Sequence, residues 1–254
     1  MSDAGGAPVR DAATVVLLRD GAAGIEAWLL TRAAAMVFAA GMSVFPGGRV
    51  DPGDAALPIA GGDLDDVAAR FGCDRAAAHG LVGAGVRETF EETGVLLSVP
   101  VADLSAARAD VELGRVAFGD LLAANGLSVD GAALRPWARW VTPPNEVRRY
   151  DTHFFVAALP STAVAQDVTS ESSAASWVPV AAALDEAGDG RRGLMPPTLA
   201  TLTSLLEFAT VADVLAAAPA RDLTPVRPRV HVEGDRVAVE LPDGTRIPIP
   251  VRPA

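Results

Sequence analysis

One short stretch, VRETFEETGV at residues 86–95, places an arginine and three glutamates within six positions. Because residues three and four apart share one face of a helix, Glu88, Glu91 and Glu92 would lie within about 6 Å of one another. Three like charges at that distance repel, and they raise at least one pKa unless a cation compensates them. Arg87 stands four residues before Glu91 and offsets only part of this charge. The stretch is therefore either a solvated acidic face or a ligand set for a divalent cation.

A glycine-rich loop upstream favours the metal interpretation. The chain turns tightly at Pro-Gly-Gly and again at Pro-Gly, both within residues 46–53. Such a loop exposes backbone carbonyls that can bind a metal and amides that can approach a phosphate. Mg²⁺ and Mn²⁺ take oxygen ligands, which a cluster of carboxylates on one rigid face supplies. Glutamates combined with this loop predict metal-assisted hydrolysis of a phosphoanhydride.

These residues resemble the Nudix box, G-x5-E-x7-R-E-U-x-E-E-x-G-U, where U is apolar. Gly48 and Asp54 match its first half, with aspartate in place of glutamate, and residues 87–95 match its second half except at Thr89. Residues 55–86 separate the two halves, where the motif has seven positions. If the gap is moved, His79 takes the position of the first glutamate instead. We expect the two halves to meet in space, because the fold requires their proximity and not their spacing.

An interrupted box of this kind resembles the Nudix branch that contains the peroxisomal coenzyme A diphosphatase. Residues 140–155, which read W-x-TP followed by RRYDTHFF, belong to the same resemblance. An upstream signature of Nudix coenzyme A hydrolases is matched in part by LLTRA at 29–33 and by Gly41-x3-FPGG, although Val37 stands where the signature has its second arginine. The resemblance implies an α/β fold, namely a Nudix-type α/β/α sandwich with a mixed β-sheet and a helical insertion at about 55–78.

The resemblance also implies roles for individual residues in a metal-dependent diphosphatase. Mg²⁺ or Mn²⁺ would be bound by Glu88, Glu91, Glu92 and the Gly47 carbonyl, with Arg87 pinning the glutamates. Glu88 or a carboxylate from a later loop would act as the general base. The candidate substrate contacts are Arg32, Gly48, Arg148 and Arg149, and the candidate additional carboxylates are Asp54 and Glu171. Each of these side chains also has a purely structural interpretation. Arg32, Arg148 and Arg149 could be surface arginines, Glu171 a solvated loop residue and His153 a hydrogen-bonded core residue.

The favoured substrate is coenzyme A or acyl-coenzyme A, within the wider class of nucleoside-diphosphate-linked compounds. Two alternatives stay open at this point. One is a Nudix hydrolase of nucleotide sugars, dinucleoside polyphosphates or oxidised nucleotides. The other is a non-catalytic Nudix module that only binds a ligand.

Composition restricts the partners and the compartment. The formal net charge is −11 and no basic block follows a nucleic-acid backbone, so we expect no nucleic-acid partner. Cys73 is the only cysteine, which is typical of a reducing compartment. No apolar run reaches the roughly 20 residues that a membrane span needs. The composition predicts a cytoplasmic protein with a small-molecule partner, and the resemblance allows a homodimer.

Several elements must position these side chains. The pattern predicts a hairpin over residues 12–30, two helices within 63–93 with Asp74 capping the second and Gly94 ending it, and a strand over 95–99. It further predicts a helix over 101–124, a strand over 149–160 and one long helix over 195–218. The expected division is a Nudix domain over 1–220 followed by a β-rich extension over 221–254.

Overall fold

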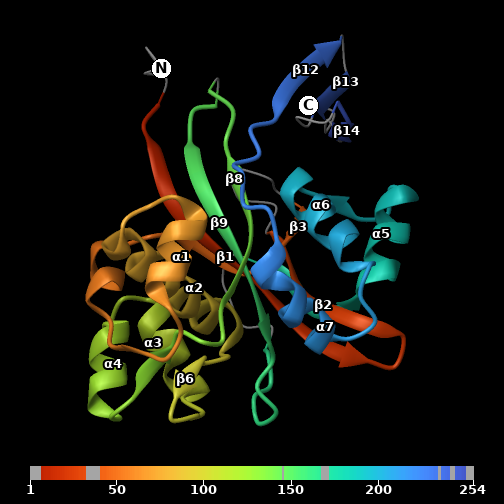
Figure 1. The fold of residues 1–254 in the computed structure, drawn as a ribbon. Coiled ribbons are helices and arrows are strands. Elements are labelled where there is room, and N and C mark those ends of the chain that lie inside the picture. The colour runs from red at the N-terminus through yellow and green to blue at the C-terminus, as the bar shows by residue number, and fades with distance from the viewer. Residues whose placement is uncertain are drawn as a thin grey trace.

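The main sheet of the protein is mixed and has eight strands (Figure 1). The computed structural model describes residues 7–32, 41–144, 146–166, 172–233, 236–240 and 244–249. The strand order is β11-β3-β2-β1-β9-β8, with β10 paired to β2 and β4 paired to β1. β1 runs parallel to β9 and antiparallel to β2, so the predicted hairpin and mixed sheet are confirmed. The strands are β1 (Val9–Gly21), β2 (Gly24–Arg32), β3 (Met42–Val44), β4 (Gly47–Arg49), β8 (Arg135–Val141), β9 (Arg149–Ala158), β10 (Ser172–Pro179) and β11 (Gly193–Leu194).

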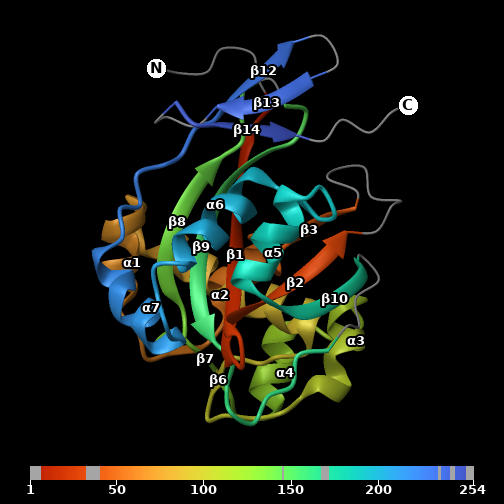
Figure 2. The same cartoon turned by 90° about the vertical axis from the view of Figure 1, so that its right-hand side faces the viewer.

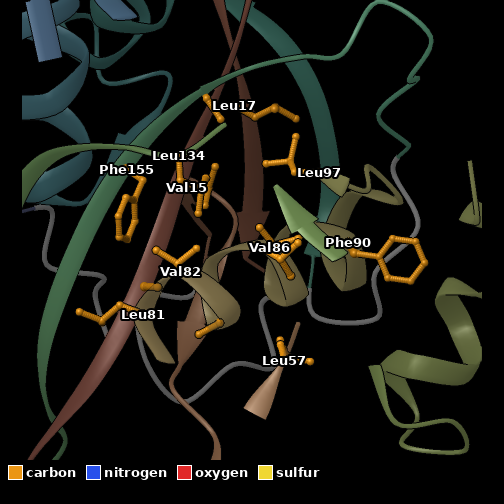
Figure 3. Close-up of a cluster of buried hydrophobic side chains, with 14 of the residues drawn as sticks. Val15, Leu17, Leu57, Leu81, Val82, Val86, Phe90, Leu97, Leu134 and Phe155 are labelled. Atoms are coloured by element: carbon orange, nitrogen blue, oxygen red, sulfur yellow. The ribbon is translucent and has the colours of Figure 1, made fainter. Parts of the chain in front are cut away.

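Helices cover both faces of this sheet (Figures 1 and 2). One face packs against α1 (Leu64–Phe71) and α2 (Arg75–Thr93), and the other against α5 (Val180–Gly188), α6 (Pro196–Leu205) and α7 (Val211–Ala217). Side chains of β1 alternate between the two cores, because successive residues of a strand point to opposite faces. Val15 and Leu17 pack with α2 (Figure 3), whereas Val16 and Leu18 pack with the later helices. The predicted α/β/α sandwich is confirmed.

The segment between the two halves of the motif folds into small elements of its own. They are the 3-10 helix η1 (Pro52–Ala56), β5 (Ile59–Ala60) and α1. β5 joins β7 (Ser128–Asp130) and β6 (Ser98–Val99) in a small second sheet. The side chain of Asp74 accepts a hydrogen bond from the Ala77 amide at 2.7 Å. Gly94 ends α2 with a φ of 74°. Both predicted ends of the second helix are therefore confirmed.

Three predicted elements differ from the structure. The strand expected over 95–99 is reduced to the two residues of β6. The helix expected over 101–124 is divided into η2 (Ser105–Ala107), α3 (Arg108–Glu112) and α4 (Phe118–Ala124), because the chain turns at Gly114 with a φ of 66°. The long helix expected over 195–218 is two helices, since Thr210 and Asp213 form a capping box that starts α7.

The last strands form a separate three-stranded antiparallel sheet (Figure 2). They are β12 (Arg229–Glu233), β13 (Arg236–Glu240) and β14 (Arg246–Ile249), and they follow the 3-10 helix η3 (Ala218–Ala220). The connecting segment pairs with β8, where the Val226 amide donates to the Arg139 carbonyl at 2.8 Å. A β-rich C-terminal tail is thus present, and the domain division at residue 220 stays a prediction. Within the described ranges, no helix combines the length and the apolar character that crossing a bilayer requires.

Candidate active site

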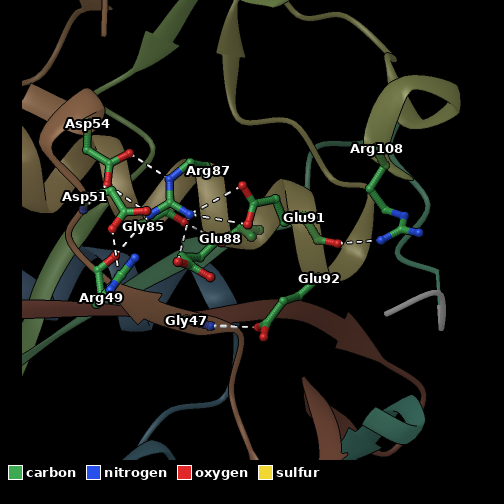
Figure 4. A network of polar contacts seen from close by, with 11 residues as sticks. Gly47, Arg49, Asp51, Asp54, Gly85, Arg87, Glu88, Glu91, Glu92 and Arg108 are labelled. Atoms are coloured by element: carbon green, nitrogen blue, oxygen red, sulfur yellow. Dashed lines mark hydrogen bonds and ion pairs between the residues drawn. The ribbon is translucent and has the colours of Figure 1, made fainter. Parts of the chain in front are cut away.

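Arg87 is the centre of a network of ion pairs on α2 (Figure 4). Its Nε and Nη2 donate to the two oxygens of Asp54 at 2.7 and 2.9 Å. Its Nη1 lies 2.8 Å from Glu88 Oε1 and 3.3 Å from Glu91 Oε2. Its Nη2 also donates to the Arg49 carbonyl at 3.0 Å. Arg87 therefore links the glutamate helix to both the glycine loop and η1.

Asp54 is the carboxylate that completes this network. It is only 1% exposed, and it also accepts a hydrogen bond from the Asp51 amide at 2.8 Å. His79, the alternative at this position of the motif, instead bonds through Nε2 to the Leu57 carbonyl at 2.8 Å. The structure thus brings Asp54, and not His79, next to Arg87 across the insertion.

Gly47 and Gly48 lie directly against the glutamates. The Gly47 amide donates to Glu92 Oε2 at 2.8 Å, and a Cβ at Gly48 would lie 2.5 Å from the Glu88 carboxylate carbon. A Cβ at Gly47 would lie 2.4 Å from the Ala13 carbonyl oxygen, because β4 pairs closely with β1 there. Gly47 leaves no room for a Cβ against the backbone of β1, and a Cβ at Gly48 would displace the Glu88 carboxylate, so both glycines let the loop touch the acidic face of α2.

Burial of this acidic face raises the pKa of two of its glutamates. Desolvation, followed by the charges of Glu91 and Asp54, raises the pKa of Glu88 to about 7, although Arg87 opposes the shift. Desolvation likewise raises the pKa of Glu91. The nearby Arg108, which the sequence reasoning missed, donates to the Glu91 backbone carbonyl at 2.8 Å and fixes the helix from the side of α3. No spacing pattern in the sequence indicated that contact.

The donor set fits a hard cation by its chemistry. Three half-buried carboxylates supply oxygen ligands, and a divalent cation would compensate the charge that burial disfavours. Glu88 and Glu91 are turned toward Arg87, and Glu92 is held by the Gly47 amide. Within the described residues, no three His, Cys, Asp or Glu side chains converge as a ready-made metal site. Metal binding would therefore require these side chains to rotate away from their present partners.

A pocket of about 410 Å³ opens beside the glycine loop. It brings together Arg32, Gly48 and Arg148 from the predicted substrate contacts, together with the aromatic ring of Tyr150. Arg149 is not among its lining residues. That side chain is buried, with 5% exposed, and it donates to the carbonyls of Thr142 and Ala7, each at 3.4 Å. Glu171 lies outside the described residues.

Comparisons with known proteins agree with this fold. The model of the NUDT19 Nudix domain matches residues 79–205. A crystal structure of a NUDIX hydrolase from Alicyclobacillus acidocaldarius is 30% identical, with a TM-score of 0.69, and the match covers 82% of this chain and 96% of that one. The chain belongs to the Nudix hydrolase family.

Two curated relatives are also similar. The acyl-coenzyme A diphosphatase NUDT19 of Xenopus laevis is 26% identical over 234 residues, covering 74% of this chain and 62% of the relative. A Caenorhabditis elegans protein provisionally named nudix hydrolase 7 is 31% identical over 184 residues, covering 70% of this chain and 54% of the relative. The chain thus spans between half and two thirds of the length of these two relatives. The predicted resemblance to the Nudix branch with a coenzyme A diphosphatase is confirmed.

Proposed function

We propose that the protein hydrolyses a diphosphate bond in a nucleoside-diphosphate-linked substrate, using Mg²⁺ or Mn²⁺ bound by Glu88, Glu91 and Glu92. One observation carries this proposal. Glu88, whose pKa is raised by burial, lies against Gly48, and Gly48 also lines the pocket that contains Arg32 and Arg148. The proposed cation site and the proposed anion-binding pocket would therefore share one wall.

Each group in this arrangement has a defined task. Glu88, Glu91 and Glu92 would hold the cation, whose chemistry when bound would be a lower pKa for water and compensation of the negative charge on the diphosphate. Arg87 pairs with Glu88 and Glu91, so it keeps both carboxylates on one face of α2 and would release them to the cation. Arg32 and Arg148 would donate hydrogen bonds to phosphate oxygens. Glu88 is our candidate for the general base, because its carboxylate lies against Gly48, which lines the pocket.

Coenzyme A or acyl-coenzyme A is the favoured substrate. Support comes from the name of the Xenopus laevis relative, an acyl-coenzyme A diphosphatase. Further support comes from Arg32, which belongs to the partly matched upstream signature and lines the pocket. Nucleotide sugars, dinucleoside polyphosphates and oxidised nucleotides stay the alternative, because Tyr150 beside Arg148 offers a ring on which a base could stack. The cytoplasmic location and the homodimer also stay predictions.

A substrate panel tests the proposal. The protein would be assayed with Mg²⁺ and with Mn²⁺ against coenzyme A, acyl-coenzyme A, nucleotide sugars and dinucleoside polyphosphates, with product identification. We expect 4′-phosphopantetheine or its acyl form as a product. Rapid cleavage of another diphosphate without that product would contradict only the choice of coenzyme A as substrate, and diphosphate hydrolysis itself would stand.

Substitutions of the glutamates separate catalysis from simple binding. Glu91→Gln and Glu92→Gln should each abolish metal-dependent turnover. Glu207→Gln is the matched control, because Glu207 is exposed and does not line the pocket beside Gly48. A wild-type protein that cleaves nothing in the panel, yet binds one of its members, would favour the non-catalytic module instead.

A further inference from the structure

The pocket beside Gly48 is bounded by the main sheet and by the first turn of α6. β1 and β9 form one wall, because they run side by side there and Ala12 pairs with Thr152. The first turn of α6 forms a second wall with Pro197 and Thr198. The pocket is therefore enclosed by two layers of the fold.

Three threonines, Thr14, Thr152 and Thr198, line this pocket. Farther along β1, the face that carries Thr14 carries Val16 and Leu18, which pack in the core that α6 covers. The side chains on this face thus change from apolar to hydroxyl-bearing where the sheet borders the pocket. Within the part of the chain that the structure describes, none of the three hydroxyls makes a hydrogen bond. All three are therefore available to a bound molecule.

Thr198 is the most enclosed of the three threonines. The residue is only 3% exposed. Among the described residues, the polar atoms that are both sealed from solvent and without a partner include Oγ1 of Thr201, but not Oγ1 of Thr198. Because the Thr198 hydroxyl has no partner either, the surface that it keeps opens into the pocket that it lines. A buried side chain on a rigid helix thus presents an accessible hydroxyl to a ligand.

The other residues around the pocket restrict what it can bind. Tyr150 supplies an aromatic ring, and Val44, Phe45 and Met195 supply apolar surface. Arg148 lines the same pocket, and no Asp or Glu is among the described residues that line it. A threonine hydroxyl can both donate and accept a hydrogen bond. The pocket therefore suits an uncharged, flat group that carries donors and acceptors and is attached to a phosphate.

We propose that this pocket binds the nucleobase of the substrate, and that Thr152 and Thr198 select it by hydrogen bonds to its edge. The inference rests on the proposed function, because the diphosphate would extend from the base past Gly48 to the glutamates. A base carries donors and acceptors on its edge, and its flat face can stack on Tyr150. The half of the substrate beyond the diphosphate then lies outside the pocket. Selectivity is therefore directed at the nucleoside half.

Calorimetric titration of the full chain with adenosine 5′-monophosphate in Mg²⁺ tests the proposal. This probe has a base and a phosphate but no diphosphate bond, so its binding does not depend on hydrolysis. Ribose 5-phosphate lacks the base and should bind about tenfold more weakly or worse. Equal affinities of these two compounds, or tighter binding of 4′-phosphopantetheine than of adenosine 5′-monophosphate, would overturn the proposal. A protein that binds the base in this way but cleaves no diphosphate would contradict the proposed function and not the base site.

Two variants of nearly unchanged shape locate the contacts. Thr152→Val and Thr198→Val each remove one hydroxyl, so each should weaken binding of adenosine 5′-monophosphate about threefold or more and leave that of ribose 5-phosphate unchanged. Thr203→Val is the control on α6, because the exposed Thr203 donates to the Leu199 carbonyl at 2.9 Å and does not line the pocket. If one variant does not fold, as judged by circular dichroism, the other decides the question. Unchanged affinity in the folded variants, or an equal loss in Thr203→Val, would overturn the proposal.

Discussion

Asp54→Asn is the substitution that most directly tests whether the divided motif works as one unit. Asp54 is 1% exposed and accepts hydrogen bonds from Arg87 Nε, Arg87 Nη2 and the Asp51 amide, all at 2.7 to 2.9 Å. An asparagine there keeps one acceptor oxygen and turns an NH₂ group toward a donor. It also leaves Arg87, whose side chain is 12% exposed, without its closest counter-charge.

The expected cost follows from this geometry. Breaking a buried ion pair by removing one partner costs about 3–5 kcal/mol. Arg87 keeps its contacts with Glu88, Glu91 and the Arg49 carbonyl, so we expect a smaller loss in the free energy of unfolding, about 2–4 kcal/mol. Urea unfolding should show a lower midpoint with an unchanged slope.

Asp65→Asn is the matched control for this charge change. Asp65 pairs with Arg75 on the same insertion, but the two side chains are 76% and 61% exposed. Its removal should cost less than about 1 kcal/mol. If Asp54→Asn lowered the midpoint no more than Asp65→Asn does, the Asp54–Arg87 pair would not be what joins the two halves of the motif.

Three further predictions concern the same site. Gly48→Ala should lower kcat/KM at least tenfold, because the new Cβ would lie 2.5 Å from the Glu88 carboxylate carbon and displace it. Gly53→Ala is the control, and it should leave kcat/KM unchanged, because no atom lies within 4 Å of a Cβ there. Equal effects of the two substitutions would mean that the contact between Gly48 and Glu88 does not matter for catalysis. When a chelator keeps the protein free of metal, burial raises the pKa of Glu88 from 4.5 in the unfolded chain to about 7 in the folded state. The folded state therefore binds the Glu88 proton more tightly than the unfolded chain does. The free energy of unfolding should then fall by up to about 3 kcal/mol as the pH rises from about 4.5 to about 7. Glu88→Gln should remove most of that change in the urea midpoint, and an unaltered pH dependence in this variant would refute the assignment. Arg148→Gln should raise KM at least fivefold with little effect on stability. Arg149→Gln should mainly lower the melting temperature, since it removes donors to the half-buried carbonyls of Thr142 and Ala7; the reverse pattern in steady-state kinetics and thermal melts would reassign the two arginines.

The acidic helix and the glycine loop could be predicted because their signals are local. Asp74 and Gly94 mark the ends of α2 by short-range capping, and the continuous apolar run at 12–18 is typical of a strand buried on both faces. The capping box of Thr210 and Asp213 is an equally local signal, although it stands inside an apolar pattern that is typical of one long helix. The start of α7 is therefore encoded in the sequence next to it.

Other features depend on contacts between distant residues. Arg148 and Arg149 are neighbours at the start of β9, yet only Arg148 lines the pocket beside Gly48. A shift of one residue in the preceding loop would exchange their positions, because strand side chains alternate with a period of two. Nothing in residues 142–148 fixes that register from the sequence. Arg108 and its bond to the Glu91 carbonyl are hidden for the same reason, since two separate helices must first pack.

The insertion is compatible with an assembled site because it is attached to the rest of the fold at its middle as well as at its ends. The cost of closing a longer loop grows only with the logarithm of its length, so extra residues add little cost if they form contacts. α1 forms such contacts at its C-terminal end, where Arg139 of β8 donates to the Phe71 carbonyl and Arg70 Nη2 donates to the Ala218 carbonyl at 2.8 Å. Arg139 in turn pairs with Asp151 of β9 through two bonds of 2.8 and 2.7 Å. With α1 tied to the sheet, the chain before it must bring Asp54 back over α2, and there Asp54 meets Arg87.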